Sequence, residues 1–164
     1  DQAKTFIYAL IYGAGDEKLG SVVKGNRQDG KRLRQHFFDN NPSFKTLRDK
    51  VTRAAKKGYL KGLDGRKIFI RSEHAALNSL LQGGGAVIMK KGLALFDSLI
   101  KLNTYDAKFV ANIHDEWQME VHETIATNVG QLAVDCIKTA GNYYNLRCPM
   151  DGEYKVGRDW SETH

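Results

Sequence analysis

Apolar side chains recur at helical spacing through the first third of the chain. Over residues 2–13 this spacing places Phe6 and Leu10 on one side of a helix. The same pattern predicts three further helices, over residues 16–24, 27–39 and about 42–57. The first part of the chain is therefore expected to be helical.

The pattern then changes to strands. Asp64-Gly65 separates short apolar runs at 59–62 and 67–70, and this dipeptide between two such runs is a hairpin signal. A long helix is expected over 73–102, although it contains Gly83-Gly84-Gly85, which is poor helix composition. These glycines indicate either the close approach of another backbone or a ligand, or a break between two helices.

Alternating apolar and polar positions mark a second hairpin further along the chain. Residues 108–114 and 117–121 are the predicted strands, with Asp115-Glu116 at the turn between them. We also expect a helix over 123–144 and a short final strand over 150–156. This order of helices and hairpins predicts an α+β fold with an antiparallel sheet.

Composition narrows the class of protein. With 41% apolar and 27% charged residues, the chain has the make-up of a globular domain. Its net charge of +6 favours an acidic partner such as nucleic acid. No apolar run approaches the roughly 20 residues that cross a bilayer, so no membrane partner is expected. Cys136 and Cys148 match no metal pattern or disulfide framework, which favours reduced thiols in a cytoplasmic protein.

One face of the first predicted helix carries candidate chemistry. Lys4, Tyr8 and Tyr12 are spaced four residues apart and therefore form a row, which Gly13 follows. A lysine near a helix N-terminus suits phosphate, aromatic rings suit bases and sugars, and a glycine lets another base or backbone come close. Aromatic stripes at this spacing usually belong to a core, but this one lies opposite the predicted core side.

Two adjacent carboxylates, Asp115 and Glu116, stand at the predicted tip of the second hairpin. Clustered carboxylates repel each other and are tolerated where a cation neutralises them. Hard oxygen ligands on a strand suit Mg²⁺. A solvated turn is the ordinary explanation of such a dipeptide, and a histidine such as His114 is more often structural than a ligand.

A further row lies on one face of the predicted long helix. His74, Asn78 and Gln82 are spaced four residues apart, and amide side chains can read base edges or sugars in a groove. A polar solvent face would show the same spacing. Basic residues also crowd the third and fourth helices, at Lys31, Arg32, Arg34, Lys45, Arg48, Lys50, Arg53, Lys56 and Lys57. Phosphate backbones attract such surfaces, although a solvated helix face explains them nearly as well.

These features are weak singly, but their order resembles one family. Residues 3–15 closely resemble the fingers-helix motif B of A-family DNA polymerases, and residues 113–116 resemble their palm motif C. Between them, residues 62–67 and 74–82 resemble the intervening palm segment. The similarity runs over essentially the whole chain, including Gly157-x-x-Trp160, and is closest to bacteriophage replicative members.

The resemblance implies a nucleotide-binding role for the first row. Lys4 would bind the triphosphate of the incoming nucleotide and donate a proton to the leaving pyrophosphate. Tyr8 would pack against the incoming sugar and base. Tyr12 would stack near the templating position, with Gly13 beside it.

It also implies metal-binding and DNA-binding roles. Asp115 would be a metal ligand and a catalytic residue, with Glu116 as its less essential neighbour. The implied DNA contacts are His114 at the primer terminus, Asn78 and Gln82 along the minor groove, and, more weakly, Arg66 and His74.

The implied activity is template-dependent nucleotidyl transfer in DNA replication, on primer–template DNA and dNTPs. Two Mg²⁺ ions would clamp the attacking 3′ oxygen and the leaving group, while the protein contributes mainly positioning. The implied fold is fingers helices over residues 1–58 and part of an antiparallel palm sheet over residues 59–164. The expected location is cytoplasmic, in the host if the source is viral.

One part of the family pattern is missing. The family's other metal-binding aspartate lies in motif A, upstream of the fingers, and no aspartate here has that motif's setting. The chain also starts at Asp1, inside a helical pattern. We therefore expect a piece of a longer polymerase or a natural split subunit, inactive without an N-terminal portion that carries motif A.

Three other classes stay open. The main alternative is a non-catalytic basic DNA-binding module. A metal hydrolase would use His114, Asp115, Glu116 and His122, although no His-x-x-x-His or paired-cysteine spacing supports it. A plain structural domain would need all these motif matches to arise by chance in the right order.

Overall fold

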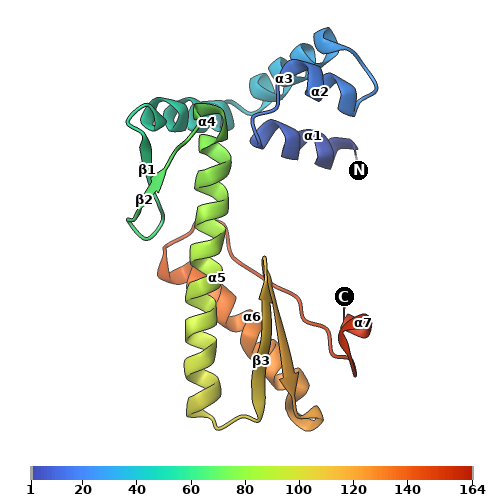
Figure 1. The fold of residues 1–164 in the computed structure, drawn as a ribbon, viewed down its shortest axis with the longest axis vertical. Coiled ribbons are helices and arrows are strands. Elements are labelled where there is room, and N and C mark those ends of the chain that lie inside the picture. Colours follow the sequence, from blue (N-terminus) through green and yellow to red (C-terminus); the bar gives the residue numbers. More distant parts are fainter. Residues whose placement is uncertain (1, 164) are drawn as a thin grey trace. The chain divides into compact units, whose positions relative to one another are not determined.

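The computed structural model describes residues 2–163 (Figure 1). The chain divides into two compact units, Asp1–Gly83 and Gly84–His164. Helix α5, Ala76–Leu102, carries the chain from the first unit into the second. The predicted division after residue 58 into fingers and palm stays a prediction, because compactness alone does not test it. No helix of the described residues has the length and apolar character needed to cross a membrane.

Four helices open the first unit, and all end within two residues of their predicted bounds. They are α1 Gln2–Ile11, α2 Asp16–Val22, α3 Arg27–Asn40 and α4 Pro42–Ala55. A capping box starts α3, because the Asn26 side chain accepts from the backbone N–H of Asp29 and the Asp29 carboxylate accepts from that of Asn26. Pro42 is the first residue of α4, where its missing N–H costs nothing.

The first unit buries two apolar clusters. One joins the first three helices through Leu10, Leu19 and Phe38. The other joins α4, the first hairpin and the start of α5 through Val51, Ala55, Leu60, Ala76 and Leu77. The hairpin consists of β1 Tyr59–Lys61 and β2 Lys67–Phe69, which pair antiparallel. Its inner face is therefore held by the second cluster.

Helix α5 follows a short 3₁₀ turn, η1 Glu73–Ala75, and is continuous through Gly83-Gly84-Gly85. The alternative of two helices with a break is therefore wrong. A Cβ atom added to Gly83 would lie 3.1 Å from Cδ1 of Ile68, whereas Gly84 and Gly85 have no described neighbour within 4 Å of that position. Among the described residues, no other backbone approaches these glycines closely, and the close approach of a ligand stays a prediction.

The second unit packs a hairpin against two helices. Strands β3 Ala107–Ile113 and β4 Glu116–Val121 pair antiparallel, with an irregular register between Phe109 and Ala111. A 3₁₀ turn, η2 Glu123–Ile125, leads into α6 Ala126–Tyr143. The buried core of this unit consists of Phe96, Ile100, Val129, Ala133 and Cys136. Trp117 of β4 stacks on the Phe96 ring, with ring centroids 5.8 Å apart, which anchors the hairpin on α5.

The final part of the chain differs from the prediction. Residues 150–156 are extended but are not a strand, because no described strand lies beside them to form a ladder. Their apolar side chains pack on α6 instead, with Tyr154 against Gly130 and Met150 against Gly141. A short helix that was not predicted, α7 Trp160–Thr163, follows. The α+β class is confirmed, with two separate two-stranded antiparallel sheets among the described residues.

Candidate functional site

The predicted row on α1 is exposed. Tyr8 and Tyr12 are 52% and 53% exposed, and Lys4 is exposed as well. Phe6 and Leu10 face the apolar cluster on the other side of the helix, as their spacing predicted. No described side chain forms an ion pair with Lys4 or a ring contact with Tyr8. The Lys4 ammonium and the rings of Tyr8 and Tyr12 are therefore available to a ligand.

Two contacts connect the end of α1 to residues some sixty to seventy positions later. The amide nitrogen of Gln82 donates a hydrogen bond to the Tyr12 hydroxyl, with 2.8 Å between the two atoms. Gly13 has a φ of +77°, and a Cβ atom there would lie 2.4 Å from the backbone oxygen of His74. Gly13 thus combines a left-handed conformation with a close backbone contact, which only glycine accommodates. The structure therefore brings together Tyr12, Gly13, His74 and Gln82.

The other predicted DNA-contact residues of this unit lie apart from those contacts. Asn78 is half-buried on α5, and its side chain forms no hydrogen bond with a described residue. Arg66 lies in the turn between β1 and β2, where its guanidinium pairs with Asp64. Although desolvation raises the pKa of Asp64, its hydrogen bonds with Arg66 and the Arg66 charge hold that pKa below its usual value. The predicted role of Arg66 stays a prediction.

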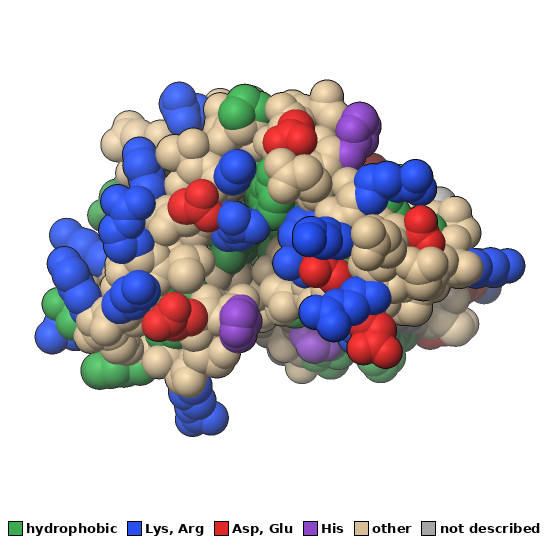
Figure 2. Space-filling view, turned by 90° about the horizontal axis from the view of Figure 1, so that it is seen from above, with side chains coloured by type: hydrophobic (Ala, Val, Ile, Leu, Met, Phe, Trp, Pro, Cys, Tyr) green, Lys and Arg blue, Asp and Glu red, His purple; other side chains and the backbone are tan. Residues whose placement is uncertain are grey.

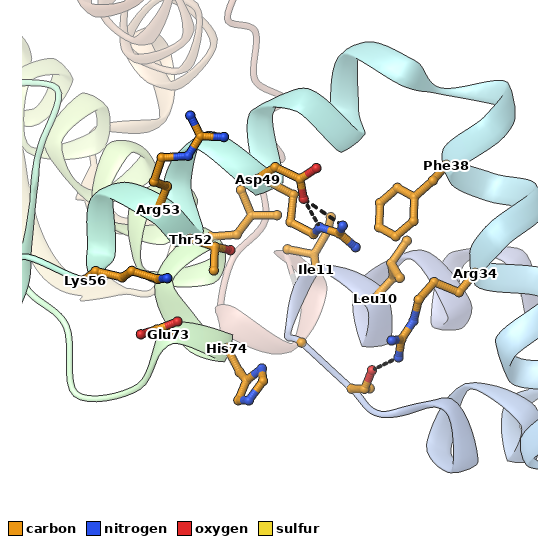
Figure 3. Close-up of a pocket in the computed structure, with 14 residues that line it drawn as sticks. Leu10, Ile11, Arg34, Phe38, Asp49, Thr52, Arg53, Lys56, Glu73 and His74 are labelled. Atoms are coloured by element: carbon orange, nitrogen blue, oxygen red, sulfur yellow. Dashed lines mark hydrogen bonds and ion pairs between the residues drawn. The ribbon is translucent and has the colours of Figure 1, made fainter.

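The first unit also contains a cavity that the sequence did not reveal (Figure 3). Its volume is about 450 Å³. It is lined from α1, α3, α4 and η1, and its charged or titratable lining residues are Arg34, Arg48, Asp49, Arg53, Lys56, Glu73 and His74. Arg48 pairs with Asp49 at 2.7 Å, whereas Arg53 and Lys56 have no ion pair with a described residue. The crowding of basic residues on two helices was the available signal, but it could not show that their faces converge.

The hairpin of the second unit turns at His114 and Asp115. His114 has a φ of 55°, while Asp115 is outside the left-handed region. A positive φ at the first turn position alone matches a type II′ turn, where glycine is usual. A side chain in that conformation costs about 1 kcal/mol, and such strain concentrates at functional sites.

The two carboxylates at this turn differ in their surroundings. Asp115 is exposed and has no hydrogen bond or ion pair with a described residue, whereas Glu116 accepts a hydrogen bond from the Gln118 side chain. Among residues 2–163, no three or more His, Cys, Asp or Glu side chains converge to hold a metal ion. An exposed carboxylate that is not paired with a described basic side chain offers hard oxygen donors, which Mg²⁺ prefers. Asp115 therefore fits one ligand position of a magnesium site, and further donors are needed.

The chain is similar over its length to phage and bacterial polymerases. It is 40% identical to the DNA-directed DNA polymerase of Escherichia phage Phieco32, over 100% of this chain and 28% of the relative. The DNA-directed DNA polymerase of Escherichia phage T7 is 36% identical, over 100% and 26% of the two chains. DNA polymerase I of Aquifex aeolicus is 32% identical, over 98% and 29%. The chain thus spans 26% to 29% of the length of these relatives.

The structure is similar to a solved one as well. The POL domain of Pol1 from M. smegmatis, in complex with DNA primer-template and dNTP, matches with a TM-score of 0.83 and 26% identity, over 92% of this chain and 28% of that one. The family model of DNA polymerase family A matches residues 1–162. Because this match covers nearly the whole chain, the chain belongs to DNA polymerase family A.

Proposed function

We propose that this chain supplies the nucleotide-binding fingers helix and one metal-binding carboxylate of a DNA-directed DNA polymerase. The hydrogen bond between Tyr12 and Gln82 carries the proposal, because it joins a residue expected at the templating position to one expected along the DNA minor groove. Membership of family A supports the proposal that these two residues belong to one site. The similar M. smegmatis structure contains DNA primer-template and dNTP, which supports both as partners.

The exposed row on α1 would meet the incoming nucleotide. Lys4 has no described counter-charge, so its ammonium is available to the triphosphate and can donate a proton toward the leaving pyrophosphate. The Tyr8 ring, half-exposed, offers a stacking surface to sugar and base. The hydrogen bond from Gln82 restricts the Tyr12 side chain, which reduces the reorganisation that its ring needs to meet the template.

Contacts to primer–template DNA would come from both units. His74 lies in η1, Asn78 and Gln82 follow in the first turns of α5, and Gln82 keeps amide hydrogen-bonding capacity beyond its bond to Tyr12. His114, exposed beside Asp115, would touch the primer terminus. Arg66 would contribute only by exchanging its pairing with Asp64 for a phosphate.

Asp115 would hold magnesium, with Glu116 beside it in support. When bound, the two ions supply charge neutralisation at the attacking and leaving oxygens. Because the described residues contain no converging set of three ligands, the remaining donors would come from the motif A portion of a longer polymerase. The chain by itself is accordingly proposed to be inactive in primer extension.

A nucleotide titration tests the role of the row directly. We would follow the amide NMR signals of the chain during titration with dTTP and, separately, with thymidine. The expected result is that dTTP shifts signals of α1 at lower concentration than thymidine, since Lys4 binds the triphosphate. Lys4→Gln should weaken dTTP binding by about fivefold, the effect of one solvent-screened charge contact. Lys18→Gln, an exposed lysine of α2, is the matched control.

Two results would contradict the proposal. One is equal binding of dTTP and thymidine, which would show that no triphosphate contact forms. The other is an equal loss of dTTP affinity in Lys4→Gln and Lys18→Gln, which would reduce the row to general positive charge. The second result would favour the non-catalytic DNA-binding module.

A further inference from the structure

One face of the β1–β2 hairpin packs on an apolar cluster, and the opposite face is exposed. Leu60 is buried and Ile68 packs on the same apolar cluster, so the inner face is anchored. Side chains alternate along strands, and the register of the pair therefore places the remaining residues together on the outer face. That face carries two cross-strand pairs, Tyr59 opposite Phe69 and Lys61 opposite Lys67.

Phe69 is the aromatic residue most open to water among the described residues. It is 77% exposed and makes no ring contact with a described aromatic side chain. Its partner Tyr59 is occupied, because the Lys67 ammonium lies 4.7 Å from the centroid of its ring. Most of the Phe69 side chain is thus available, beside a positive charge that lies against the Tyr59 ring.

The two lysines of this face are an unfavourable pair in the free hairpin. Like charges directly opposite each other across strands destabilise a sheet. The outer face has no carboxylate to offset them, and Asp64 in the adjoining turn is already paired with Arg66. Figure 2 shows further Lys and Arg side chains gathered on the side of the surface where α4 lies. An anion bound between Lys61 and Lys67 would relieve their repulsion.

We propose that the outer face of the β1–β2 hairpin binds single-stranded DNA, with a base stacked on Phe69 and neighbouring phosphates on Lys61 and Lys67. A ring beside lysines is the usual combination for single strands, since every base has a face that can stack. A duplex hides those base faces, and an acidic peptide would use the lysines but not the ring. The proposal stands apart from the catalytic one, because no residue assigned to the nucleotide or the metal lies on this face.

Binding of short oligonucleotides to the whole chain tests this inference. The probes are a fluorescent oligothymidine of about ten nucleotides, within the site size of single-strand binders, and an abasic strand of equal length and charge. Phe69→Ala should weaken oligothymidine binding by about tenfold and leave the abasic strand unchanged. Lys67→Gln should weaken both and reduce the slope of log affinity against log salt by about 0.7.

A matched control separates the ring from general exposure. Leu102 is also 77% exposed, and Leu102→Ala should leave both affinities unchanged. Phe69→Trp should restore the oligothymidine affinity lost in Phe69→Ala, which a folding defect would not explain. The proposal is overturned if Phe69→Ala binds oligothymidine like the parent chain, or if the abasic strand binds as tightly as oligothymidine. It is also overturned if Phe69→Ala weakens binding of a glutamate-rich peptide instead.

Discussion

The two units present their candidate residues in opposite ways. In the first unit, two of the site residues at the end of α1 are held by contacts within the fold, Tyr12 by the Gln82 side chain and Gly13 by the His74 backbone. In the second unit Asp115 stands at the tip of a hairpin without a described partner, next to His114 in a strained conformation. The end of α1 is thus fixed by contacts within its unit, whereas the Asp115 side chain has no such contact among the described residues.

Because of this difference, substitutions at the two sites should change the free energy of unfolding in different ways. Substitutions at the held site should lower the free energy of unfolding, because each removes a contact that the native fold makes. Substitutions at the hairpin tip should leave stability unchanged or raise it, because the tip contributes strain and few contacts. Four measurements can break or sharpen this comparison.

The largest effect is expected at Gly13. Gly13→Ala combines a positive φ with a Cβ atom placed against a backbone oxygen, so we expect the free energy of unfolding to fall by about 3 kcal/mol. Gly15→Ala is the control, since a Cβ atom there meets nothing within 4 Å. Urea unfolding of the two variants measures the difference. Equal midpoints would show that the end of α1 is not held as described.

The next largest effect concerns the two cysteines of the second unit. Cys136 is 3% exposed, and burial, with a smaller contribution from the Asp135 charge, raises the pKa of its thiol, whereas Cys148 is exposed. The thiolate is the reactive form, so alkylation near neutral pH should be about a hundredfold slower at Cys136 than at Cys148. Peptide mass spectrometry after iodoacetamide treatment gives both rates. Comparable rates would mean that the core beneath the hairpin is open.

A smaller and opposite effect is expected at the hairpin tip. His114→Gly removes the cost of a side chain at a φ of 55°, so it should raise the free energy of unfolding by about 1 kcal/mol. Thermal unfolding with His122→Gly as a comparison measures this, because His122 has a φ of −58°. A loss of stability in His114→Gly would show that the tip is supported rather than strained.

The smallest effect is the coupling between Tyr12 and Gln82. A double-mutant cycle with Tyr12→Phe and Gln82→Ala should give about 0.5 kcal/mol, the lower end for a hydrogen bond because both residues are exposed. Additive effects of the two substitutions would mean that the contact does not organise the site.

The sequence was sufficient wherever local pattern decides the structure. The side of α1 that carries Phe6 and Leu10 is buried as its spacing predicted, and the Asp64-Gly65 turn forms the predicted hairpin. The strand predicted over residues 150–156 is wrong because a strand needs a hydrogen-bonded partner strand. Side-chain alternation does not show whether such a partner lies beside the segment.

Features that depend on distant segments, or on a turn type that its residues do not signal, could not be predicted. The convergence of Arg53 and Lys56 on one cavity requires the relative placement of α1, α3 and α4. The left-handed conformation of His114 follows from a two-residue turn, which a histidine does not signal. The Gly13 contact was anticipated as a close approach, but its partner, the His74 backbone, was not.

The most direct test of the central claim is primer extension with Mg²⁺ and dNTPs. The chain would be assayed alone and in combination with the remainder of the phage T7 relative, outside the 26% that this chain matches. The same two assays would be repeated with two single variants of the chain, Asp115→Asn and Asp106→Asn. We predict extension only in the combination, lost in Asp115→Asn and kept in Asp106→Asn, an exposed aspartate before the same strand. Extension by the chain alone, or full activity with Asp115→Asn, would contradict the account.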